Sequence, residues 1–252
     1  MTAPGFSASH LARAYDAVVV RTQRAQIRGL LGAREGEAVA DLGCGPGHLA
    51  GELALDVGPR GRVVALDREP GMVEAATVRL TGDRSRTVLA DVTALPVADQ
   101  QLDRAVAVQV LEYVPDVERA LSEVRRVLKP GGTAVLVDTD WRSAVWHTDD
   151  RDRTDAVLRA WEGHFKHPQL PVLMPGLARS AGFTSVDVVA LPMVETQTGA
   201  DTYSMGMAAA IAHFVGRTEP VLATGWREDV KEQSRRGQYF FSLTRFATIV
   251  RR

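Results

Sequence analysis

Residues 39–47 (VADLGCGPG) combine residue types that suit the binding of a polar small molecule. The first of them are apolar and predict a buried strand, and Gly43, Gly45 and Gly47 follow at alternate positions before a helical stretch begins. Glycine tolerates the backbone angles of a tight turn and allows a ligand to approach the main chain closely. The start of a helix adds unpaired N–H groups and a partial positive charge. A strand, a glycine turn and a helix start in this order predict a binding loop.

Two residues at this loop favour a ligand with an ammonium group over a nicotinamide dinucleotide. The dinucleotide fingerprint G-x-G-x-x-G requires a third glycine at a position that His48 occupies here. Asp41 ends the strand directly before the loop, where its carboxylate would repel a pyrophosphate and attract an ammonium group. The alternative is that Asp41 only accepts hydrogen bonds from N–H groups of the loop, and the two roles are compatible.

Two further acids stand at the ends of predicted strands. Strands and helices alternate between residues 39 and 138, which predicts a parallel sheet with right-handed crossovers. The second strand is expected over residues 61–67 and ends in Asp67, and the third is expected over residues 87–91 and ends in Asp91. Ligands of such sheets bind at the carboxyl ends of the strands, so both acids belong at the edge that carries the glycine loop.

The segment that contains these motifs resembles the class I S-adenosylmethionine-dependent methyltransferases. The resemblance extends over residues 39–138, and the branch is methyltransferase type 11, which includes the ubiquinone and menaquinone C-methyltransferases. It implies a Rossmann-like, doubly wound α/β fold with a seven-stranded, mostly parallel sheet and an antiparallel last strand. Helices would cover both faces of the sheet and add a helical cap. The implied cofactor is S-adenosyl-L-methionine, which becomes S-adenosyl-L-homocysteine, without a metal.

The resemblance also assigns cofactor-binding residues. Asp67 would accept hydrogen bonds from both ribose hydroxyls, with a plain surface acid as the alternative. Asp91 would bind the adenine amino group beside the N–H of Val92, and otherwise only shapes a turn. Met72 would pack on the adenine or belongs to the core, and Gln109 would line the methionine end. The full predicted set is Arg21, Asp41, Gly43, Cys44, Gly45, Gly47, Asp67, Arg68, Met72, Asp91, Val92 and Gln109.

An N-terminal helix is expected over residues 8–32. Arg21, Arg24 and Arg28 share one of its faces. In related methyltransferases an arginine and a tyrosine before the first strand hold the methionine carboxylate, and the resemblance points to Arg21 and Tyr15 for these roles. The alternative is a solvated charged face.

Residues 138–147 leave the carboxyl end of the predicted fifth strand and are rich in Trp, Asp and His. Methyl transfer is an in-line displacement, so the protein mainly positions the reactants and excludes water. A phenol or carbon acid as acceptor gains from a general base. We expect His147 as the first candidate for this catalytic base, Asp140 as the second and Tyr15 as the third. The alternative for His147 is that it caps the helix that follows.

One methyltransferase domain is expected over residues 1–252, with a cofactor-binding core at 36–139. Two insertions, at about 140–180 and 194–238, are expected to form a roof over the acceptor, because connections this long are usually functional. The second contains two helical stretches and lies between strands predicted at 183–191 and 239–250. Otherwise these residues only pack helices onto the sheet.

The composition limits the partners. With 45% hydrophobic and 24% charged residues and a net charge of −1, the chain is typical of soluble globular proteins and has no general affinity for nucleic acid or anionic membrane. The single cysteine, Cys44, excludes a disulfide or a cysteine cluster within one chain. No signal-peptide pattern and no apolar run of about 18 residues is present. We expect a cytoplasmic monomer or homodimer that binds a small-molecule acceptor.

The expected function is the transfer of a methyl group to N, O or C of a small aromatic or apolar metabolite. Within this class, the alternative acceptor is a quinone or another lipid precursor that is methylated on carbon. A non-catalytic S-adenosylmethionine-binding protein is a second alternative, because the sequence motifs account for cofactor binding and not for catalysis. A nicotinamide-dependent oxidoreductase is disfavoured by His48 and Asp41.

Overall fold

The computed structural model describes residues 15–80, 84–199 and 202–252. Its eight strands form one sheet in the order β3-β2-β1-β4-β5-β8-β6, and β7 also pairs with β8. The strands are β1 (Ala38–Leu42), β2 (Arg62–Asp67), β3 (Arg86–Leu89), β4 (Leu102–Val108), β5 (Leu128–Thr139), β6 (Val145–Trp146), β7 (Ser185–Glu195) and β8 (Phe241–Arg251). The first five strands are parallel, and the other three pair antiparallel. The predicted doubly wound fold is confirmed, and the two-residue β6 is an addition to it.

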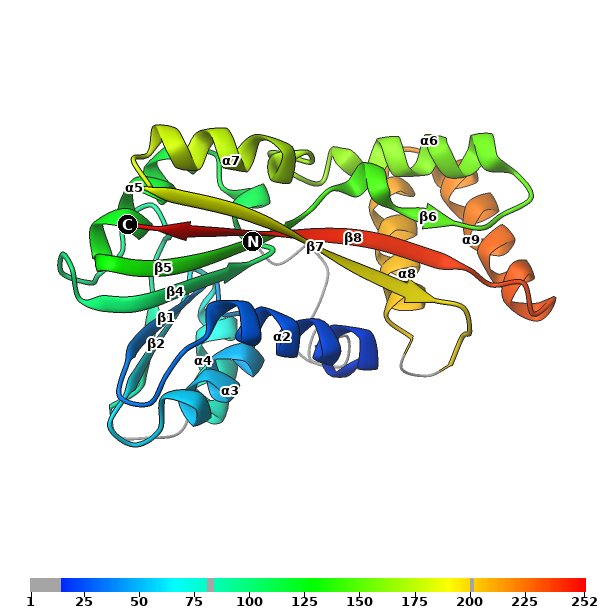
Figure 1. Ribbon diagram of the computed structural model, residues 1–252. Coiled ribbons are helices and arrows are strands. Elements are labelled where there is room, and N and C mark those ends of the chain that lie inside the picture. Colours follow the sequence, from blue (N-terminus) through cyan, green and yellow to red (C-terminus); the bar gives the residue numbers. More distant parts are fainter. Residues whose placement is uncertain (1–14, 81–83, 200–201) are drawn as a thin grey trace.

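Helices cover both faces of the parallel strands (Figure 1). One face is covered by α2 (Val18–Leu31), α3 (His48–Val57) and α4 (Pro70–Arg79), and the other by α5 (Val117–Val127) and α7 (Leu170–Ser180). Because side chains alternate along a strand, Val39 of β1 packs against α2 and α3, while Ala38 and Ala40 face α5. All five residues of β1 are buried, as its continuous apolar run predicts.

The predicted cap is a second helical layer at one end of the sheet. It consists of α6 (Arg151–Glu162), α8 (Tyr203–Val215) and α9 (Pro220–Arg235), which lie together in Figure 1. These helices pack on the parts of β7 and β8 that extend beyond β5. The resulting cap cluster contains the buried residues Trp141, Trp146, Val157, Trp161, Phe165, Tyr203, Ile211, Val215, Trp226, Val230, Phe241 and Leu243.

One predicted element lies partly outside the described residues, and one predicted insertion differs from the structure. The helix expected over residues 8–32 is described from Tyr15 onward, and its regular part, α2, ends where Gly32 adopts a left-handed conformation with φ of 58°. Its first residues lie outside the described range. The insertion expected at 140–180 contains α7, which packs on β5, β7, β8 and α5 and therefore covers the sheet rather than the cap. Leu170, Met174 and Ala178 form its buried stripe.

Within the described ranges, none of the helices combines the length and the apolarity that a membrane span requires.

Gly47 allows α3 and α4 to lie close together. It precedes α3 with φ of 84°, and a Cβ atom on it would lie 2.7 Å from the Cα atom of Ala76 in α4. Both features exclude a larger residue without a shift of one helix. We expect Gly47→Ala to lower the free energy of unfolding by ~1–3 kcal/mol, since overpacking and left-handed strain act together.

Thermal and urea unfolding would measure this effect, which corresponds to a melting temperature lower by roughly 2–10 °C. The control is Gly71→Ala in α4, where a Cβ atom would meet nothing within 4 Å. Equal stability of the two variants would show that the close approach of α3 and α4 does not require Gly47.

Candidate functional site

A cavity of about 240 Å³ opens at the carboxyl ends of the parallel strands. Its wall is built from the loop after β1, the ends of β2 and β4, the segment after β3, the start of α2 and the cap. Among the residues predicted from the sequence, the lining contains Tyr15, Asp41, Gly43, Cys44, Gly45, Asp67, Arg68, Met72, Asp91, Val92 and Gln109. Segments that are far apart in the sequence thus meet in one cavity at the expected edge of the sheet.

The glycine loop is fixed against β2 by its backbone. The N–H of Cys44 donates to the carbonyl of Leu66 at 2.8 Å, and Gly43 and Gly45 have φ values of 70° and 52°. A Cβ atom on Gly43 would lie 2.4 Å from a methyl carbon of Val110, so the position admits only glycine. A Cβ atom on Gly45 would lie 3.6 Å from the hydroxyl of Tyr15, which therefore covers the loop.

Asp67 is held in one orientation at the rim of the loop. Its Oδ2 atom accepts from the N–H of Gly45 at 2.9 Å, and its Oδ1 atom accepts from the N–H of Glu69 at 3.0 Å. Each carboxylate oxygen has a second lone pair. The preset carboxylate can therefore accept two further hydrogen bonds from neighbouring hydroxyls of a ligand.

Asp41 is a buried carboxyl with an unused acceptor. It is 2% exposed and accepts from the N–H of Ala50, and its Oδ2 atom has no partner among the described residues. Burial, and next the charge of Asp67, raises its pKa to about 7. A cationic ligand group beside it would stabilise the ionised form.

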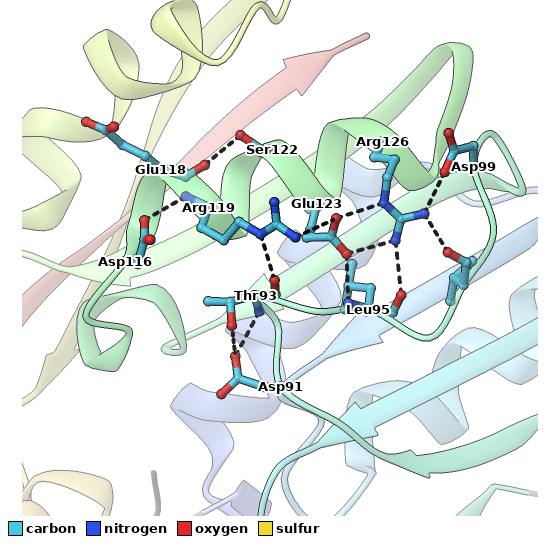
Figure 2. A network of polar contacts seen from close by, with 11 residues as sticks. Asp91, Thr93, Leu95, Asp99, Asp116, Glu118, Arg119, Ser122, Glu123 and Arg126 are labelled. Atoms are coloured by element: carbon cyan, nitrogen blue, oxygen red, sulfur yellow. Dashed lines mark hydrogen bonds and ion pairs between the residues drawn. The ribbon is translucent and has the colours of Figure 1, made fainter.

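The segment after β3 is clamped to α5, as Figure 2 shows. The carbonyl of Thr93 accepts from Arg119 at 3.1 Å, and the N–H of Leu95 donates to Glu123 at 2.8 Å. Arg126 in turn donates to the carbonyl of Leu95 at 3.0 Å. The segment is thereby held in position beside the cavity.

Asp91 belongs to the same network. It accepts hydrogen bonds from the hydroxyl and the N–H of Thr93 at 2.6 and 2.8 Å. These bonds lower its pKa, so at neutral pH it is an ionised acceptor for a ligand amino group.

The part of the cavity beneath the cap is aromatic. Its wall includes Tyr113, Trp141, Trp161, His164 and Tyr203. The rings of Trp161 and His164 stack with centroids 4.3 Å apart, and burial lowers the pKa of His164 to about 4. The imidazole is therefore neutral at physiological pH. These residues suit a planar apolar ligand, and the sequence reasoning did not single out His164 or Tyr113 for this role.

Several predicted site residues lie elsewhere. Arg21 is exposed on α2, and Arg24, one turn further along, is buried and reaches the cavity. Gly47 packs on Ala76, and the described lining of the cavity does not contain it. The difference at α2 arises because the helix turns Arg24, and not Arg21, toward the sheet.

The three candidate bases have little support from this geometry. His147 is exposed, and Asp140 binds the side chain of Arg142 at 2.9 Å. Neither is part of the described wall of the cavity. Tyr15 lies in the wall, but burial raises its pKa to about 12, so its phenol keeps its proton at neutral pH. Burial likewise raises the pKa of Cys44, which excludes a reactive thiolate.

Residues 40–136 match the family model "Methyltransferase domain". This segment of the chain is therefore similar to methyltransferase domains. The matched residues begin in β1 and end in β5, and they include the glycine loop, Asp67, Asp91 and Gln109.

Two relatives are similar to parts of the chain. The demethylmenaquinone methyltransferase of Desulfitobacterium hafniense is 36% identical over 110 residues, which are 42% of this chain and 44% of the relative. A 37.1 kDa protein of a Streptomyces fradiae transposon is 35% identical over 193 residues, 74% of this chain and 55% of the relative. The chain spans about half the length of the curated relatives that it matches.

A solved structure supports the fold. A phosphoethanolamine N-methyltransferase of Haemonchus contortus, in complex with phosphomonomethylethanolamine and S-adenosylhomocysteine, aligns with a TM-score of 0.57 at 17% identity. The alignment covers 91% of this chain and 52% of that one. Similarity at this level shows that the methyltransferase fold extends beyond the matched residues.

The raised pKa of Asp41 predicts that the stability of the protein depends on pH. Because the pKa is about 7 in the folded state and ~3.9 in the unfolded state, the folded protein binds the additional proton between these values. The free energy of unfolding therefore falls as the pH rises through this range. Between pH 5 and 8 we expect the wild type to lose ~2–3 kcal/mol more than Asp41→Asn.

Urea unfolding of both proteins at pH 5 and 8, without ligand, would measure the difference. Asp155→Asn removes an exposed carboxylate of α6 and is the matched control. Parallel stability curves for the wild type and Asp41→Asn would contradict the assigned pKa.

Proposed function

We propose that the chain is an S-adenosylmethionine-dependent methyltransferase that acts on N, O or C of a small aromatic or apolar acceptor. The observation that carries this proposal is the order of acids around one cavity. Asp41 lies before the glycine loop, Asp67 at the rim of the loop and Asp91 after β3. This order suits an ammonium group, a ribose and an adenine of one ligand.

The residues of this chain would hold the cofactor as follows. Asp67 would accept from the ribose hydroxyls, and Asp91 with the N–H of Val92 would bind the adenine edge. The buried side chain of Met72 would pack on the adenine. Asp41, whose Oδ2 atom has no described partner, would accept from the ammonium group. When bound, S-adenosylmethionine supplies a methyl group activated for displacement.

The remaining contribution of the protein would be to position the acceptor and to exclude water. The cap supplies the apolar wall beneath which an acceptor can lie, and it reduces access of water to the reacting atoms. Trp141 and Trp161 are buried in that wall, and their rings pack edge to face with centroids 5.6 Å apart.

A narrower alternative is a quinone precursor that is methylated on carbon. The demethylmenaquinone methyltransferase relative and the aromatic wall beneath the cap favour it. We further propose that the protein is a cytoplasmic monomer or homodimer. Because the net charge is −1, nucleic acid is not proposed as a partner. A protein that binds the cofactor without catalysis would release no S-adenosylhomocysteine with any acceptor.

Ligand-dependent thermal unfolding tests the cofactor. At 100-fold excess over its Kd, S-adenosylhomocysteine should stabilise the protein by ~2.7 kcal/mol and raise the melting temperature by roughly 5–10 °C. We expect Asp67→Asn to bind it ~10–100-fold more weakly, since charge-assisted bonds to the ribose are lost. NAD and NADP should give no shift.

Glu69→Gln is the control, because it changes a neighbouring acid whose side chain is not part of the described cavity wall. A shift with a dinucleotide alone would show that the glycine loop binds another ligand. Equal weakening by both substitutions would remove the ribose role from Asp67.

A further inference from the structure

One arginine of the cavity has no acidic partner among the residues that the structure describes. Arg24, Arg68 and Arg245 all line the cavity. Arg24 pairs with Glu52 at 3.0 Å, and Arg68 lies 3.9 Å from Glu69. Arg245 is 4% exposed, and no carboxylate of a described residue lies within 4.0 Å of its guanidinium. A buried charge without a counter-charge is costly, which makes Arg245 a candidate binding group for an anion.

Within the described part of the chain, the guanidinium of Arg245 is oriented by neutral groups. Its Nη1 atom donates to the side-chain oxygen of Gln23, and its Nη2 atom donates to the hydroxyl of Tyr203 at 3.0 Å. Gln23 is itself fixed, since its amide donates to the carbonyl of Leu191 at 3.2 Å. The Nε atom has no described partner. An arginine has five N–H donors, so Arg245 retains donors for a ligand.

The nearest buried acids do not replace an ion pair. The N–H of Glu112 donates to the side chain of Asp138 at 3.2 Å, and the side chain of Glu112 accepts from the N–H of Thr139 at 3.3 Å. Asp138 precedes Thr139, which pairs with Arg245 across β5 and β8, so the Asp138 side chain belongs to the opposite face of the sheet. Burial raises the pKa of Asp138 to about 7 and also raises that of Glu112. The charge of Arg245 partly offsets this effect of burial on both acids, but neither carboxylate lies within 4.0 Å of its guanidinium.

The location of Arg245 favours the acceptor over the cofactor. Its strand, β8, is separated from β1 by β4 and β5, a distance of ~14 Å in the sheet. The glycine loop and Asp41 are at β1. The guanidinium carbon of Arg245 lies 5.7 Å from the ring centroid of Tyr203, which belongs to the cap. Arg245 is thus located where the sheet meets the aromatic wall formed with Trp141 and Trp161.

We propose that the methyl acceptor is a planar aromatic acid, whose carboxylate or phenolate oxygen binds Arg245. This inference rests on the proposed methyltransferase function and specifies its substrate class. The aromatic wall accommodates the ring system, and Arg245 forms charge-assisted hydrogen bonds with the acidic oxygen. Arginine suits this role because its planar fork matches the geometry of a carboxylate. A neutral molecule of the same shape leaves the buried guanidinium without a counter-charge and binds more weakly.

Calorimetric titration of acids and their amides tests this inference. The probes are benzoate against benzamide and naphthoate against naphthamide, added to the protein with and without saturating S-adenosylhomocysteine. In the wild type we expect at least one acid to bind ~10–100-fold more tightly than its amide. In Arg245→Gln the preference should fall below about 2-fold, and Arg245→Lys should retain part of it. Arg227→Gln, which removes an exposed arginine of α9, should retain all of it.

Further measurements distinguish a local effect from a folding defect. Circular dichroism and the affinity for methylthioadenosine, which lacks the amino-acid part of the cofactor, report on an intact fold. Tyr203→Phe keeps the charge and removes one oxygen that orients Arg245, so it should lower the preference for the acid by ~3-fold. If Arg245→Gln does not fold, the acid–amide comparison in Tyr203→Phe tests the role of Arg245 instead.

Three outcomes would overturn the inference. The first is that acids and amides bind the wild type with equal affinity. The second is that Arg245→Gln still prefers the acid to its amide. The third is that Arg245→Gln loses affinity for S-adenosylhomocysteine but not for methylthioadenosine. The last would assign Arg245 to the cofactor carboxylate. Failure of the wild type to bind S-adenosylhomocysteine would instead overturn the proposed function, which the acid–amide comparison does not test.

Discussion

The backbone pairing of β8 joins the two halves of the molecule. Its residues from Arg245 to Arg251 pair with β5 in the core, and the whole strand, from Phe241 onward, pairs with β7. The first four residues therefore extend beyond β5, where the cap packs on them. One continuous strand thus sets the position of the aromatic wall beneath the cap relative to the glycine loop. Arg245 is the residue at which β8 leaves β5, so its side chain lies at the junction.

Unpartnered polar atoms mark both ends of the cavity. Among the described residues, no partner is found for the Oδ2 atom of Asp41 at the end near β1 or for the Nε atom of Arg245 at the end near β8. Each is more than nine-tenths buried, so each lowers the stability of the ligand-free protein. A cationic group at one end and an anionic group at the other would relieve this. The distribution of charge therefore supports two ligands of opposite local charge in one cavity.

The part of the site that depends on local sequence could be predicted. Asp67 ends β2 and Asp91 follows β3, and the parallel topology brings both acids to one edge of the sheet. Arg245 could not be assigned, because its role depends on the register of β8 against β5 and on contacts from α2 and α8. The sequence did contain one indication, because Arg245 is a charged residue at a position of β8 that alternates with apolar residues and is buried. His147 was predicted to lie near the opening of the cavity because it closely follows β5 in the sequence, but its side chain is exposed at the surface.

All four tryptophans of the chain, Trp141, Trp146, Trp161 and Trp226, belong to the cap cluster. Tryptophan fluorescence therefore reports on the cap alone, whereas far-ultraviolet circular dichroism reports on the secondary structure of both the cap and the core. Two-state unfolding requires the two signals to change together. If the cap loosens before the core, the indole emission changes first. Trp141 and Trp161 also line the cavity, so the same emission reports its occupancy without any added label.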